Sequence, residues 1–181
     1  HNLGLLWVHT DGKLSSSELF SFQAVSEDDG LSAYTNLSSE KQHFSDSDTT
    51  RRSRFPAQWL VSADRRACGR LEDTLGAKRL YTTDGEEMRS MHLSCFVYKD
   101  FNVGMALCAS AMVLAHNAGY PMLFVAIPAA EAEMWRTFLG KQLQVVAPAT
   151  FFVAGFEVDS VKNNAKNEGS SPAWIINSAD I

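Results

Sequence analysis

The residues that could do chemistry gather at one turn in the second half of the chain. Gly104 and Ala106 are small residues at the junction between an expected strand and an expected helix. Small residues let a ligand approach the backbone, and a helix N-terminus offers N–H donors and a positive dipole to an anion. The same pattern is typical of a tight turn with close packing of helix on strand, so both interpretations stay open.

Titratable side chains lie near this turn. His92 alternates with Met91 and Leu93 along the expected strand, so we expect it on the opposite face, as a candidate general base. Cys95 and Cys108 fall within apolar segments, which favours buried, unreactive thiols. The three cysteines of the chain are widely spaced. This spacing predicts neither a disulfide framework nor a metal site, and it favours a reducing, cytoplasmic location.

Other function classes are disfavoured by the sequence. It contains no G-x-S-x-G elbow, P-loop, dinucleotide fingerprint, H-E-x-x-H or paired zinc-ligand motif. The net charge of −5 and the pI near 5.5 disfavour nucleic acid as a partner. Residues 101–130 contain no charged side chain, but Gly119 and Pro121 interrupt them. A helix, a stop and a buried strand explain this segment better than a membrane span does.

The elements that must position these residues are clearest from residue 91 onward. Alternating apolar residues, helix formers and glycine stops predict the order β–α–β–α–β–β. The expected segments are a strand over 91–99, a turn over 100–104, a helix over 105–117, a strand over 120–127, a helix over 129–139, and strands over 143–147 and 151–158. The predicted fold class is therefore α/β (α+β), a mixed sheet with helices packed on it.

The N-terminal half carries weaker signals. The sequence predicts strands over 3–8, 55–61 and 78–82, a helix over 63–75, and a strand or docked tail over 174–176. Residues 15–25 fit a helix and a strand equally well, and the polar residues 26–54 are expected to be mostly loop. The length of 181 residues favours one domain over 1–161, followed by a linker and tail over 162–181. Self-association stays open.

Residues 91–158 resemble the C-terminal half of the GNAT superfamily of N-acetyltransferases. In that superfamily a strand leads into a turn with the pattern Gln/Arg-x-x-Gly-x-Gly/Ala, whose backbone amides hold the pyrophosphate of coenzyme A. Residues 101–106 keep Gly104 and Ala106 of this pattern but have Phe101 at its first position.

The resemblance implies an acyltransferase that moves an acyl group from a thioester, on acetyl-coenzyme A or an acyl carrier, to an amine. The donor's pantetheine would lie between the strands 91–99 and 120–127, which splay in this fold. Backbone amides of residues 96–98 would stabilise the tetrahedral oxyanion. On the opposite strand face, His92 would meet the acceptor. The residues that would hold the donor are Phe96, Val97, Tyr98, Asn102, Val103, Gly104, Met105 and Ala106.

The chain departs from the family at a catalytic position. Members often carry a tyrosine four residues before the glycine that closes the last helix, as general acid to the leaving thiolate. Arg136 stands there; it could stabilise negative charge but donates no proton readily. Acyl-homoserine-lactone synthases, a branch with the same core, also lack this tyrosine and carry a Ser-Arg-Phe motif, which Ser53, Arg54 and Phe55 match. The departures keep a second interpretation open, a non-catalytic GNAT-like module that binds a ligand or a protein.

Overall fold

The structure, a computed structural model, describes residues 2–11, 21–38, 42–43, 55–73, 80–81, 84–150 and 174–175. The helices are α1 (Glu27–Ser38), α2 (Phe101–Asn117) and α3 (Ala132–Leu139), with short 3₁₀ turns η2 (Ala129–Glu131) and η3 (Gly140–Gln142). The strands are β1 (Asn2–His9), β2 (Phe22–Val25), β3 (Gln42–His43), β4 (Ala57–Ser62), β5 (Ala67–Asp73), β6 (Leu80–Tyr81), β7 (Glu87–Met88), β8 (Ser90–Tyr98), β9 (Met122–Pro128), β10 (Leu143–Thr150) and β11 (Trp174–Ile175).

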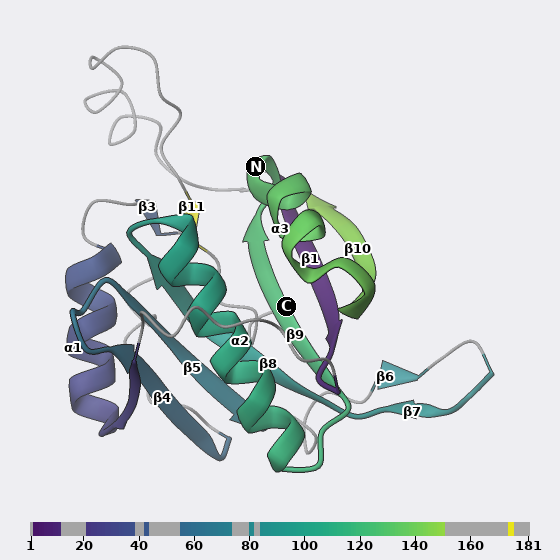
Figure 1. The fold of residues 1–181 in the computed structure, drawn as a ribbon, viewed down its shortest axis with the longest axis horizontal. Coiled ribbons are helices and arrows are strands. Elements are labelled where there is room, and N and C mark those ends of the chain that lie inside the picture. The colour runs from purple at the N-terminus through teal and green to yellow at the C-terminus, as the bar shows by residue number, and fades with distance from the viewer. Residues whose placement is uncertain are drawn as a thin grey trace, which may run out of the picture.

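Seven strands form one mixed sheet in the order β10-β1-β9-β8-β5-β4-β2 (Figure 1). β8 and β9 are parallel and are connected by α2, whereas the other neighbouring pairs of this sheet are antiparallel. The N-terminal strand β1 lies between β9 and β10 and pairs with both. Both halves of the chain therefore contribute to a single sheet, with β3–β11 and β6–β7 as small separate ladders.

Helices cover both faces of the sheet. α2 and α3 pack on one face, over a core that includes Leu93, Leu107 and Trp135. α1 packs on the other face, over a core that includes Trp59. The close approach of α1 requires Gly30, because a Cβ there would lie 2.2 Å from the Trp59 ring. The predicted mixed sheet with helices packed on it is confirmed.

The helix predicted over residues 63–75 is wrong, because this segment contains the strand β5. Both faces of β5 are buried: Ala67 and Leu71 contribute to the core beneath α2, and Cys68 contributes to the core beneath α1. This burial outweighs the helix propensity of the local sequence, as tertiary context often does.

The loop predicted over residues 26–54 is wrong in its first part, where α1 forms. Ser26 precedes the helix, and its Oγ accepts a hydrogen bond from the backbone N–H of Asp29 at 3.2 Å. The first turn holds three acidic residues, which suit the positive end of the helix dipole. A capped start therefore offsets the weakly apolar sequence of this helix.

The other predicted elements form within the described residues, with shifted ends. α2 begins at Phe101, so the segment expected as a turn over 100–104 supplies the first turn of the helix. The ambiguous segment 15–25 contributes the strand β2. Outside the described residues lie the strand predicted over 151–158, the linker over 162–172, and Ser53 and Arg54. No helix in the described ranges is long and apolar enough to cross a membrane.

Candidate functional site

The parallel strands β8 and β9 pair along only part of their length. The pairing extends to Leu93 and Val125, whereas β8 continues to Tyr98 and β9 to Pro128. From there the strands diverge toward the start of α2 and of α3 (Figure 1). We call this separation of the two strands the split. It is the splay that the resemblance implies for these strands.

A β-bulge lies in β8 where the split begins. Between Ser94 and Val97, β8 has one residue more than the stretch of β5 that faces it. Cys95 takes a positive φ of 49°, a conformation that costs a non-glycine residue about 1–2 kcal/mol. Beyond the bulge, the side chains of Phe96 and Tyr98 belong to the core beneath α2 and α3.

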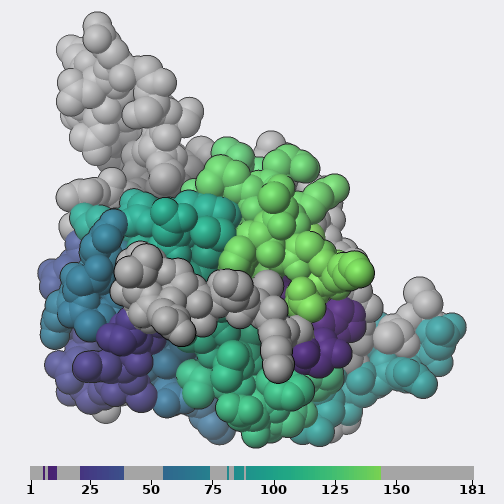
Figure 2. Space-filling model, in the orientation of Figure 1, coloured from purple at the N-terminus to yellow at the C-terminus, as the bar shows by residue number. Residues whose placement is uncertain are grey.

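Aromatic side chains fill the space beside the split on the face of α2 and α3. The Trp135 ring is fully buried. Its centroid lies 5.8 Å from the centroid of the Phe96 ring and 5.1 Å from that of the Phe101 ring. The rings of Tyr98 and Phe138 lie 6.2 and 6.0 Å from the same indole. These contacts join the start of α2 to α3, which adjoin in the space-filling view (Figure 2).

A polar contact connects the end of β8 to the segment after β9. The Tyr98 hydroxyl donates a hydrogen bond to the Glu131 carboxylate, and Trp135 Nε1 donates to the same oxygen at 3.3 Å. Burial, followed by the charge of Glu131, raises the pKa of Tyr98 far above its usual value. The phenol therefore stays protonated and serves as a donor across the split.

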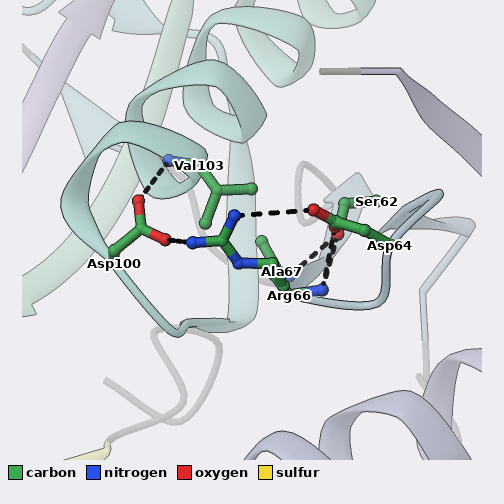
Figure 3. A network of polar contacts seen from close by, with 6 residues as sticks. All are labelled: Ser62, Asp64, Arg66, Ala67, Asp100 and Val103. Atoms are coloured by element: carbon green, nitrogen blue, oxygen red, sulfur yellow. Dashed lines mark hydrogen bonds and ion pairs between the residues drawn. The ribbon is translucent and has the colours of Figure 1, made fainter. Parts of the chain in front are cut away.

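The N-terminus of α2 is capped by Asp100 (Figure 3). The Asp100 carboxylate accepts a hydrogen bond from the Val103 N–H at 3.2 Å and forms an ion pair with Arg66. A second Arg66 nitrogen lies 3.7 Å from the Asp64 carboxylate. The Gly104 N–H donates to the Asp100 carbonyl at 3.1 Å. Two backbone amides of the predicted donor-binding segment therefore already have acceptors within the chain.

Gly104 allows α2 to pack closely on β8. A Cβ at this position would lie 2.8 Å from the nearest carbon of the Tyr98 ring. Val103 and Ala106 are buried in the core on the same helix, whereas Asn102 is exposed and Met105 is partly buried. The Tyr98 ring thus fills the space next to Gly104 on the β8 side of α2.

A buried polar cluster lies on the other face of the sheet, near the start of α1. Arg70 Nε lies 3.0 Å from Glu72 Oε1, and a terminal guanidinium nitrogen lies 3.5 Å from Glu27 Oε1. Trp59 Nε1 donates to Glu27 Oε2 at 2.9 Å, and the Arg70 guanidinium lies over the Trp59 ring. Arg70 and Glu72 are 3% and 1% exposed. Each of these buried charges is therefore stabilised by the opposite charge beside it.

His92 lies next to this cluster. It is the cross-strand neighbour of Glu72, and its ring lies 4.8 Å from that of Phe124. Phe124 is also its partner in the β8–β9 ladder, one residue before the pairing ends. His92 is therefore placed at the closed end of the split, on the face of α1.

The structure does not bring the two predicted catalytic residues together. Arg136 lies on α3, on the other face from His92, with its side chain 57% exposed and its Nε 3.7 Å from Glu133. Burial raises the pKa of the Cys108 thiol to about 12, so this cysteine stays protonated and unreactive. Among the described residues, no group of His, Cys, Asp or Glu side chains could hold a metal.

The start of α2 does not fit the pyrophosphate of coenzyme A. The position that would face a phosphate carries the Asp100 carboxylate, and Tyr98 fills the space next to Gly104. An anion brought there would have to compete with the Asp100 carboxylate for the Val103 N–H and for Arg66. Sequence reasoning missed Asp100 as a cap, although an Asp before an uncharged helix is a cap signal.

Comparison with known proteins shows the fold. A putative acetyltransferase from the GNAT family of Novosphingobium aromaticivorans matches with a TM-score of 0.51 and 14% identity, over 82% of this chain and 62% of that one. A GCN5-related N-acetyltransferase from Anabaena variabilis matches with a TM-score of 0.51 and 10% identity, over 81% and 39%. A functionally unknown conserved protein from Staphylococcus epidermidis matches with a TM-score of 0.51 and 13% identity, over 81% and 59%.

These likenesses define the class of fold. The chain has a GNAT-like α+β fold, and the likeness extends beyond the C-terminal half to which the sequence resemblance is confined. The chain spans less than two thirds of the length of each of these three structures. No family model and no curated protein sequence matches it.

Proposed function

We propose that the protein is an N-acyltransferase that takes its acyl group from a thioester. The main support is the split, with the bulge at Cys95, because the pairing of β8 with β9 ends there. Along residues 96–98, backbone N–H groups on the β9 side of β8 would bind the thioester carbonyl and stabilise the oxyanion that forms on it. A GNAT-like fold is consistent with this activity.

In this proposal His92 is the general base. The acceptor amine approaches on the face of α1 and attacks the thioester carbon, while an imidazole nitrogen of His92 takes the amine proton. A C–N bond forms, the C–S bond breaks, and the proton passes to the departing thiolate. Glu72, the cross-strand neighbour of His92, stabilises the imidazolium by its negative charge.

The test measures thiol release from S-acetyl pantetheine with a panel of amines. We expect His92→Gln to lower kcat about 10²- to 10⁴-fold, the usual contribution of a general base. His116→Gln is the matched control, because His116 is exposed near the end of α2. Equal rates for the His92 and His116 variants would exclude His92 as the base, and no turnover by the wild-type protein would exclude the activity.

A second candidate function is a non-catalytic GNAT-like module. The specific observation in its favour is that the chain's own side chains fill the start of α2 and bridge the split. Calorimetric titration with coenzyme A and S-acetyl pantetheine, combined with the thiol-release assay, separates the two functions. Binding of a thioester without thiol release supports the module, and binding with turnover supports the enzyme.

A further inference from the structure

The N-terminus of α2 already holds an anion, and that anion belongs to the chain. α2 is 17 residues long, and its dipole places about half a positive charge at its start. The Asp100 carboxylate lies at this end and is fixed there by the Val103 N–H and by Arg66. The favourable position for a phosphate is therefore taken by a residue of the chain.

A second observation, independent of charge, agrees with this. The Tyr98 ring fills the space that Gly104 leaves on the β8 side of α2, so a ligand cannot approach the helix backbone from that side. The ring is held by its hydrogen bond to Glu131 and by its packing on Phe96 and Trp135. A diphosphate at the start of α2 would have to displace the paired Asp100 carboxylate, and it could not use the space beside Gly104, which the packed ring fills.

We infer that Asp100 excludes a diphosphate from the start of α2, so that the acyl donor is recognised through its thioester arm alone. The statement about the donor rests on the proposed function, whereas the exclusion of a diphosphate does not. Asp100 is in this view a specificity-determining residue: it disfavours nucleotide-linked donors, such as coenzyme A thioesters, relative to donors without a diphosphate at this position.

The test is calorimetric titration of the full chain with inorganic pyrophosphate. Asp100→Ser removes the charge but keeps an oxygen that can accept the Val103 N–H, because serine is an equally good N-cap. Asp64→Ser is the matched control, since Asp64 also pairs with Arg66 but does not cap the helix. We expect Asp100→Ser to bind pyrophosphate at least about tenfold more tightly than the wild type and the control, because Arg66 and the helix end become available.

Two results would overturn the inference. One is a wild-type affinity for pyrophosphate as high as that of Asp100→Ser, and the other is an Asp100→Ser protein that is folded but binds no better than Asp64→Ser. If Asp100→Ser does not fold, Asp100→Asn takes its place, because asparagine also caps helices. Turnover of S-acetyl pantetheine, measured separately, decides the proposed function whatever the pyrophosphate result.

Discussion

Gly104→Ala tests whether Tyr98 determines the packing at the start of α2. Alanine gains about 1 kcal/mol over glycine in a helix. Here its Cβ would lie 2.8–2.9 Å from three carbons of the Tyr98 ring, which Glu131 and Trp135 hold in place. Overpacking of this kind costs about 1–3 kcal/mol. We therefore expect Gly104→Ala to lower the free energy of unfolding by about 0–2 kcal/mol.

A double-mutant cycle isolates the clash from the helix propensity. In a Tyr98→Ala background the ring is gone, so Gly104→Ala should raise the free energy of unfolding by about 1 kcal/mol. Urea unfolding followed by circular dichroism measures all four proteins, in a stabilising osmolyte because Tyr98→Ala alone costs about 3–5 kcal/mol. A coupling energy near zero, with Gly104→Ala stabilising in both backgrounds, would refute the packing role of Gly104.

Two further predictions concern stability. Arg70→Met should cost about 3–5 kcal/mol, because it removes the cation that lies 3.0 Å from the buried Glu72 carboxylate, whereas Arg136→Met on the exposed surface of α3 should cost under about 1 kcal/mol in the same urea assay. Equal costs would contradict the assignment of Arg70 to a buried pair. Burial raises the pKa of the Cys108 thiol to about 12 in the folded protein, whereas in the unfolded chain it lies near 9. Keeping this thiol protonated therefore stabilises the fold fully below about pH 9, and the stabilisation is lost between pH 9 and pH 12 at about 1.4 kcal/mol per pH unit. Cys108→Ala should therefore flatten the fall of the unfolding free energy in this range, and an unchanged slope would contradict the raised pKa.

The unit β8-α2-β9 is predictable from the sequence because its signals are local. Alternating apolar residues mark β8, helix formers mark α2, and Gly119 follows the helix with a positive φ of 81°. The cap at Asp100 is local as well, and including it would have moved the predicted start of the helix from 105 to 101. The pairing of Asp100 with Arg66 is not local, since it joins a turn between β4 and β5 to α2.

β5 shows why the rest could not be predicted. Arg70 and Glu72 suggest a solvent-exposed helix face when the sequence is read alone, but both are buried in the sheet. Their burial depends on Glu27 and Trp59, which α1 and β4 bring from more distant parts of the chain. The insertion of β1 between β9 and β10 is equally non-local, because its partners are more than 100 residues away. Tertiary contacts of this kind leave no periodic signal in the strand itself.

The two faces of the sheet differ in what a ligand would have to displace. On the face of α2 and α3, the Tyr98–Glu131 hydrogen bond bridges the split, and we expect a ligand that enters from this face to break it. A hydrogen bond to a charged group contributes about 1.5–3 kcal/mol, so this opening would weaken ligand affinity about 10- to 150-fold. On the face of α1, His92 and Glu72 lie beside the closed end of the split and are only 3% and 1% exposed, so an amine that reaches them must displace the groups that cover them. The proposed transfer therefore places the amine and its base on the face of α1, and it makes the opening of the Tyr98–Glu131 bridge the cost of admitting the acyl donor.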